Sequence, residues 1–258
     1  MSLEMSIGRA FVRSLVSHPA GRAHILSLMV AAEEGDEAGV FDQLMRKADD
    51  PELEKLVRRH KEDEARHAAM YRACLARHGL AMQPVPDALM VIREVGREAG
   101  GAFAAGVDAA SADGIVTRRD VMNTYALLLA IEERGVQRFP LIGAEFRRIG
   151  DHETADTFDR VTEDERRHTK YCRAIGRRYA PDDATWERAV ANYAAIEARA
   201  FARVGSAGIA YALEHRLVGR GLLGSIARLA LRAALLTRSA LAGRVSPAPS
   251  SSGAASAA

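Results

Sequence analysis

Apolar residues recur every three to four positions along most of the chain, and this spacing predicts amphipathic helices rather than strands. No segment shows the strict alternation of a β-strand. The sequence therefore predicts an all-α protein. The predicted helical segments are 1–18, 21–47, about 51–77, 86–99, about 120–149, about 152–178, 183–215 and 218–243.

Turn and capping residues separate these segments. His18-Pro19 closes the first helix, and Asp50-Pro51 is typical of a helix start, with a capping carboxylate followed by proline at the first helical position. Asp120 is expected to cap the helix that follows the long connection 80–116. The last residues, 245–258, are Ser, Ala, Pro and Gly with one Val and no charge, so we expect them to be disordered.

The helices form two hairpins, 21–77 and 118–178, joined by a long crossover. Four units follow from this division. They are an N-terminal amphipathic helix (1–20), a four-helix bundle (21–182), a C-terminal helical extension (183–244) and the tail (245–258).

A six-residue phrase occurs once in each hairpin, as EDEARH at 62–67 and as EDERRH at 163–168, 101 residues apart. Each copy places a Glu and a His three residues apart, Glu64/His67 and Glu165/His168, so each pair shares one helix face. A single Glu-x-x-His is more often solvated surface charge. Two copies on corresponding helices favour one site built from both halves.

The first helix of each hairpin carries a pair of glutamates after an apolar run, Glu33-Glu34 and Glu132-Glu133. Glu34 and Glu132 each precede a phenylalanine by seven residues, which places each on the same helical stripe as that ring. We therefore predict Glu34 and Glu132 as ligands, with Glu33 and Glu133 as the alternatives.

The predicted set is four glutamates and two histidines: Glu34, Glu64, His67, Glu132, Glu165 and His168. Carboxylate oxygen with one imidazole per ion suits iron or manganese, and four carboxylates offset the charge of two divalent ions. The predicted cofactor is a pair of Fe ions, with Mn or a mixed Fe/Mn pair as the alternative.

With these residues and the turn DPELEKL, the chain resembles the ferritin-like superfamily, and most of all the rubrerythrin-type di-iron carboxylate proteins, over about residues 21–178. The resemblance implies a ferritin-like four-helix bundle with a di-iron centre. Two features depart from the pattern. The chain has only two cysteines, too few for the four-cysteine iron site of rubrerythrin, and it continues with helices after 183.

Further polar residues lie on or near the ligand stripes. Tyr71, Tyr125, Cys74 and Cys172 are expected to pack in the core, with a role supporting a ligand as the alternative. His60, one turn before Glu64, is expected to support a ligand, with direct metal binding as the alternative. The remaining acids of the repeated phrase are predicted to face solvent and pair with arginine: Glu62, Asp63, Glu163 and Asp164.

Three functions fit this pattern. The first is a rubrerythrin-like peroxidase or ferroxidase, an oxidoreductase that reacts with O2 or peroxide and draws on an external electron donor. The second is a di-iron oxygenase that acts on an organic substrate. The third is a non-enzymatic interaction protein that docks through the cationic segment 218–243, which contains no acid and places Arg on one side and mostly Leu on the other. That segment can instead pack on the bundle, on a second subunit of a homodimer or on a membrane surface.

Composition limits the remaining choices. A net charge of +2 predicts no nucleic-acid partner. Two cysteines suggest a reducing compartment, and Glu4 and Arg13 make the N-terminus a poor signal peptide. No stretch of about 18 uncharged apolar residues occurs before residue 215, so the body is not expected to span a membrane. We therefore expect a cytoplasmic protein, with a peripheral membrane location as the alternative.

Overall fold

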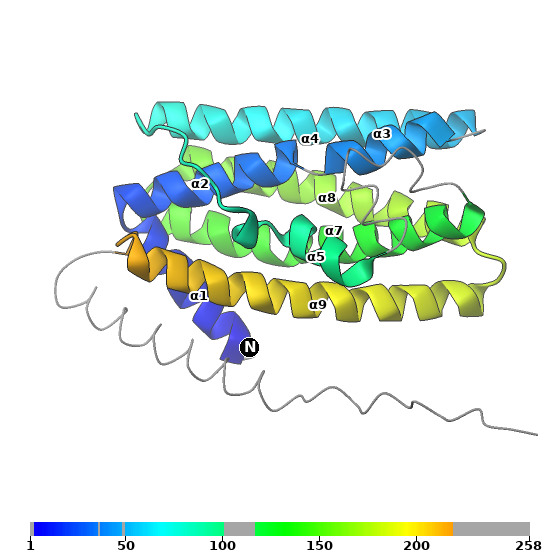
Figure 1. Cartoon of the computed structure of the whole chain (residues 1–258). Coiled ribbons are helices and arrows are strands. Elements are labelled where there is room, and N and C mark those ends of the chain that lie inside the picture. Colours follow the sequence, from blue (N-terminus) through cyan, green and yellow to red (C-terminus); the bar gives the residue numbers. More distant parts are fainter. Residues whose placement is uncertain (1–2, 36, 48–49, 101–116, 219–258) are drawn as a thin grey trace, which may run out of the picture.

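The computed structural model describes residues 3–35, 37–47, 50–100 and 117–218. Within these ranges every regular element is a helix, which confirms the all-α prediction (Figure 1). The predicted tail 245–258 and almost all of the predicted helix 218–243 lie outside the described residues. The elements are α1 (Leu3–Val16), α2 (Pro19–Glu34), α3 (Glu37–Lys47), α4 (Pro51–Arg77), the 3₁₀ helix η1 (Asp87–Leu89), α5 (Val91–Ala99), α7 (Arg118–Arg148), α8 (His152–Tyr179) and α9 (Asp183–Glu214).

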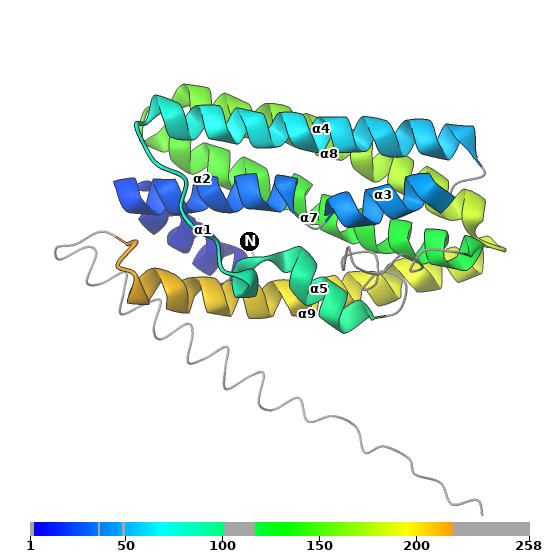
Figure 2. The same cartoon turned by 45° about the horizontal axis from the view of Figure 1, so that its top comes forward.

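The helices form two antiparallel pairs that meet through α4 and α8. Helices α2 and α3 lie end to end along α4, while α7 packs along α8 (Figures 1 and 2). Helix α9 covers α7 on the side away from α4, and α5 packs on α9. Helix α1 contacts α2 and α7. The two predicted hairpins are therefore present, and α9 and α5 add a further layer on one side.

Side-chain capping bonds start the helices α4, α7, α8 and α9. The side chain of Asp50 accepts hydrogen bonds from the backbone N–H groups of Glu52 and Leu53 at 3.1 and 3.3 Å, as predicted. Helix α7 differs from the prediction, because Thr117 is its N-cap. Asp120 lies three residues later and completes a capping box by accepting from the Thr117 N–H.

The predicted single helix 21–47 is instead two helices separated at Gly35. The backbone of Gly35 leaves the helical region (φ −77°, ψ −144°), and a Cβ at this position would lie 2.6 Å from the Ala31 carbonyl oxygen. Only glycine fits this close approach. The break changes the helical register between α2 and α3, so residues on its two sides no longer share a stripe.

Helices α4 and α8 each bury one stripe of residues that repeats at alternating intervals of four and three. Both stripes begin and end with apolar or small groups and carry ionisable side chains in the middle. This places the chemistry at the centre of the α4–α8 contact, away from solvent. The stripe on α4 is Leu53, Val57, His60, Glu64, His67, Tyr71 and Cys74, and the stripe on α8 is Thr154, Phe158, Val161, Glu165, His168, Cys172 and Ile175.

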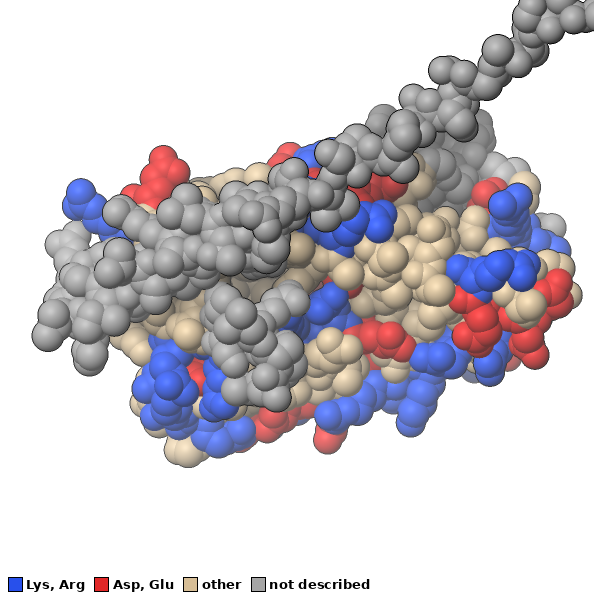
Figure 3. Space-filling view, turned by 90° about the horizontal axis from the view of Figure 1, so that it is seen from below, with Lys and Arg blue, Asp and Glu red and all other residues tan. Residues whose placement is uncertain are grey.

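The surface carries charges of both signs. On the face seen in Figure 3, basic and acidic side chains are interleaved around areas of other residues. The part of this face that the view leaves uncovered therefore presents no large area of one charge. Among the described helices, none combines the length and the apolar character that crossing a membrane requires.

A buried carboxylate attaches α1 to α7. The side chain of Glu145 is fully buried and accepts hydrogen bonds from Arg9 and Arg13 of α1 and from Arg148 of α7, at 3.0, 3.0 and 2.6 Å. Burial acts to raise the pKa of Glu145, but the three guanidinium groups outweigh it and lower the pKa from 4.5 to about 2. The charged carboxylate therefore stabilises the fold.

We expect Glu145→Gln to lower the free energy of unfolding at neutral pH by about 1–3 kcal/mol, because it removes a charge-assisted acceptor from three arginines. A depressed folded-state pKa gives stability that is present above pH 4.5 and lost as the pH falls towards 2. The difference between wild type and variant should therefore shrink over that interval. Urea unfolding at several pH values measures it. Asp159→Asn, at an exposed acid, is the control, and an equal loss there would contradict the prediction.

Candidate metal centre

Four helices deliver acidic and imidazole side chains to the centre of the molecule. They form two groups, and within each group the ligand atoms all lie within 4.8 Å of one another. Glu64 belongs to both groups. The first group is Glu33 of α2, Glu64 and His67 of α4, and Glu165 of α8. The second is His60 and Glu64 of α4, Glu132 of α7, and His168 of α8.

In the first group, the Nδ1 atom of His67 faces three carboxylates. It lies 3.3 Å from an oxygen of Glu33, 3.7 Å from one of Glu165 and 4.0 Å from one of Glu64. The His67 ring is fully buried, and the carboxylates of Glu33 and Glu165 are each 5% exposed. This group therefore offers one nitrogen and three carboxylates in a nearly dry space.

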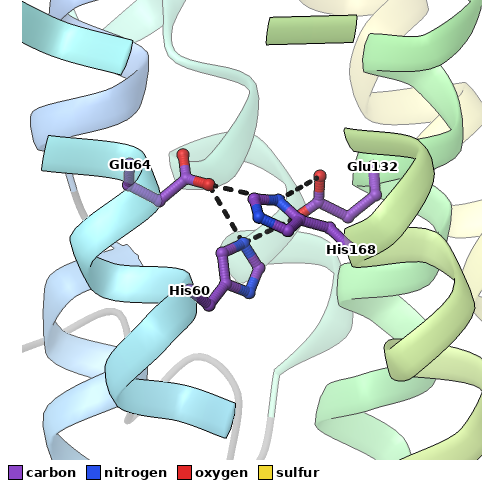
Figure 4. A group of neighbouring side chains, drawn as sticks. All are labelled: His60, Glu64, Glu132 and His168. Atoms are coloured by element: carbon purple, nitrogen blue, oxygen red, sulfur yellow. Dashed lines mark ion pairs between the residues drawn. The ribbon is translucent and has the colours of Figure 1, made fainter. Parts of the chain in front are cut away.

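In the second group, two imidazoles converge on two carboxylates (Figure 4). The Nε2 atom of His60 lies 3.0 Å from an oxygen of Glu64 and 3.0 Å from one of Glu132. The Nδ1 atom of His168 lies 3.4 Å from the same oxygen of Glu64 and 3.7 Å from the other oxygen of Glu132. This group offers two nitrogens and two carboxylates.

The charges inside the centre depend on one another. Burial acts to lower the pKa of His60 and of His168, but the surrounding carboxylates outweigh it and raise these pKa values to about 9 and about 12. Burial and the nearby charge of Glu132 raise the pKa of Glu165 well above its ordinary value. The carboxylates therefore favour the protonated imidazoles of His60 and His168, and burial favours the neutral carboxyl of Glu165.

Each half of the repeat orients the histidine of the other half. The Nε2 atom of His67 lies 3.0 Å from Asp164 Oδ2, and the Nε2 atom of His168 lies 3.2 Å from Asp63 Oδ2. When Nε2–H donates to an aspartate, the lone pair of Nδ1 points to the centre, which is how ligating histidines are held in metal sites.

Two arginines complete this arrangement. Arg66 and Arg167 each pair with both aspartates, so the four side chains connect α4 to α8 twice. Burial acts to raise the pKa of Asp164, but the bonds from His67 and the two arginines outweigh it and lower the pKa to about 2.

The prediction that Asp63 and Asp164 face solvent was therefore wrong, because Asp63 is buried and each of them contacts a histidine. The prediction that they pair with arginine is confirmed. Glu62 and Glu163 are exposed, as predicted.

The structure brings five of the six predicted ligands together and replaces the sixth. Glu34 lies outside both groups, with its side chain 45% exposed and paired with Arg72. Glu33, the alternative within that pair, takes its place. The prediction of Glu34 relied on its seven-residue spacing to Phe41. That spacing fails because the helix is interrupted at Gly35, between Glu34 and Phe41. The five that come together are Glu64, His67, Glu132, Glu165 and His168.

Two signals in the sequence favour Glu33. It lies three and seven residues after Val30 and Leu26, which are both fully buried on α2. Matching the glutamate pairs directly also aligns Glu33 with Glu132, the first member of the other pair. Glu133, the second member, points outwards and pairs with Arg173 at 2.7 Å.

The residues that were predicted to pack in the core or to support a ligand lie in different surroundings. His60 lies inside the second group rather than behind a ligand. The Tyr71 hydroxyl is buried without a hydrogen bond, and burial together with the charges of Glu33 and Glu165 raises its pKa. Tyr125 packs edge-on against Tyr171, whose ring contacts His60 and His168. Cys172 is fully buried in the hydrophobic core, and Cys74 contacts the Thr157 hydroxyl.

Several polar atoms of the centre fit a metal ion. Both ring nitrogens of His60 and one carboxylate oxygen of Glu64 are buried without a hydrogen bond. His60 Nε2 and this Glu64 oxygen lie 3.0 Å apart, within ion-pair distance but without hydrogen-bond geometry, so a cation bound between them would satisfy both. The residues present therefore fit a site for one or two metal ions.

Comparison of the chain with protein-family models, with curated proteins and with solved structures finds no match.

We expect Glu33→Ala to weaken metal binding at least about tenfold, because it removes a buried carboxylate from the first group. Glu34→Ala should leave the metal content at the wild-type level, since that side chain points to solvent and to Arg72. Metal analysis of the two purified variants makes this comparison. Loss of metal in Glu34→Ala alone would contradict the placement of these neighbours.

We expect Asp63→Asn and Asp164→Asn each to weaken metal binding about 10–100-fold, because each change loosens the orientation of a histidine. The exposed neighbours provide matched controls, Glu62→Gln and Glu163→Gln. Equilibrium dialysis against a divalent ion measures the affinities. Equal affinities in all four variants would rule out an orienting role for the aspartates.

Proposed function

We propose that the chain is a ferritin-like protein with a dinuclear non-haem metal centre, and that it acts as an oxidoreductase on O2 or peroxide. One observation carries this proposal: seven ionisable side chains from four helices converge in two groups that share Glu64. Two iron or manganese ions held there would supply the electrons that reduce O2 or peroxide. The helical architecture and the repeated Glu-x-x-His support the ferritin-like assignment.

The donor set suits this chemistry. Oxygen donors with some imidazole are the ligands that iron and manganese prefer, and no thiolate is present in either group. Glu64, which belongs to both groups, can bridge two ions, while Glu33 and Glu132 each serve a single group. The four carboxylates would balance two divalent charges in a space that excludes most water.

Residues around the centre orient the histidine ligands and influence which side chains hold protons. Asp63 and Asp164 keep the two repeated histidines in the tautomer that presents Nδ1 to the ions. The pKa of Glu165 is raised by burial and by the charge of Glu132, and a cation bound beside it would favour its charged form. Because the two cysteines are both buried and do not form a second iron site, we propose that electrons come from an external donor.

Anaerobic loading of metal-free protein with Fe2+ or Mn2+ tests this proposal. We expect about two ions per chain, and we expect the iron-loaded protein to oxidise on addition of O2 or peroxide, followed by its absorbance and by consumption of the oxidant. The double variant Glu64→Ala/Glu165→Ala should lose both ions, since it removes carboxylates from both groups.

The Glu34→Ala variant is the matched control, because it also removes a glutamate but from the surface. Metal content that does not change in the Glu64→Ala/Glu165→Ala variant would overturn the proposed centre. Stoichiometric binding without any reaction with O2 or peroxide would overturn the proposed activity alone.

A further inference from the structure

The two halves of the repeat differ at the buried position one turn before the repeated glutamate. Each residue of the α4 stripe has a counterpart 101 positions later on the α8 stripe, so Glu64 and His67 correspond to Glu165 and His168. His60 corresponds to Val161, and both are buried. One half therefore presents an imidazole one turn before its glutamate, where the other half presents an aliphatic side chain.

Aromatic rings and two carboxylates surround the ring of His60. It lies against Phe41 at 4.5 Å and edge-on to Tyr171 at 5.3 Å, between ring centroids, and it is 1% exposed. Its Nε2 atom forms ion pairs at 3.0 Å with carboxylate oxygens of both Glu64 and Glu132, while its buried Nδ1 atom has no hydrogen-bond partner. Figure 4 shows the ring pointing into the group. A buried imidazole in this position is placed to bind a cation.

We propose that His60 is a seventh metal ligand and that it makes the two metal positions chemically unequal. The position of His60, Glu64, Glu132 and His168 has two nitrogens, while the position of Glu33, Glu64, His67 and Glu165 has one. The inference rests on the proposed dinuclear centre and adds to it a difference in metal preference. The nitrogen-rich position binds Co2+ or Zn2+ more tightly, and the carboxylate-rich position is the better site for Mn2+.

Ligand chemistry sets the direction of this preference. Imidazole favours the later first-row ions, whereas carboxylates suit Mn2+, which lies at the weak end of the affinity series. The position of Glu33, Glu64, His67 and Glu165 has a third carboxylate, so more negative charge surrounds it. This charge favours a hard ion such as Mn2+. Glu64 is common to both positions, and each has a further glutamate and a histidine, so the difference is one imidazole in place of one carboxylate.

An anaerobic titration of metal-free wild-type protein with Co2+, followed by calorimetry and by the visible Co2+ absorption, tests the inference. We expect two binding steps whose affinities differ at least about tenfold. In a second measurement on the wild type, one equivalent of Co2+ added to protein loaded with Mn2+ should displace about one Mn2+, followed by electron paramagnetic resonance. Displacement of both ions in parallel would contradict the inference.

His60→Val gives the position the residue of its counterpart Val161, so it makes the two halves alike at this point. We expect the tight Co2+ step to weaken at least about tenfold and the two steps to merge, with circular dichroism showing that the variant is folded. Two wild-type steps of equal affinity, or an unchanged tight step in folded His60→Val, would overturn this inference and leave the dinuclear centre standing. Wild type that binds no ion stoichiometrically would overturn both.

Discussion

The burial of charge at the centre of the helices is the constraint on which the rest of the structure depends. Seven ionisable side chains lie in the groups around Glu64, and each is 9% exposed or less. Isolated charges could not remain in such a space, so every member needs a partner of opposite sign, a proton or a cation. The raised pKa values of His60 and His168 show that, without metal, the carboxylates recruit protons for this purpose.

The same constraint explains how the two hairpins are joined. Helices α4 and α8 meet along stripes whose middle positions are ligand-type residues, and the Asp–His and Arg–Asp contacts cross between them in both directions. The surface that holds the hairpins together is thus also the wall of the candidate site. Helices α5 and α9 pack outside this core, and α1 is attached separately through Glu145.

Local spacing made much of this predictable. A Glu and a His three residues apart share a helix face in any helix, so the repeated phrase located Glu64, His67, Glu165 and His168 without a structure. The turns of the hairpins could also be predicted from local sequence, because helix capping at Asp50-Pro51 and at Asp151 involves only residues within a few positions. Glu34 failed because its register was counted from Phe41, across a helix break that the pattern of apolar residues does not reveal.

The sequence by itself therefore determined most of the helices, their pairing into two hairpins and the stripe on which most candidate ligands lie. Only the tertiary structure decided that His60 joins the centre and that Asp63 and Asp164 contact histidines of the opposite half. The physical reason is the range of the interactions. Helix formation and helix faces follow from neighbours three or four residues away, whereas these contacts join side chains on different helices, up to about 100 residues apart in sequence, and exist only after the helices have packed.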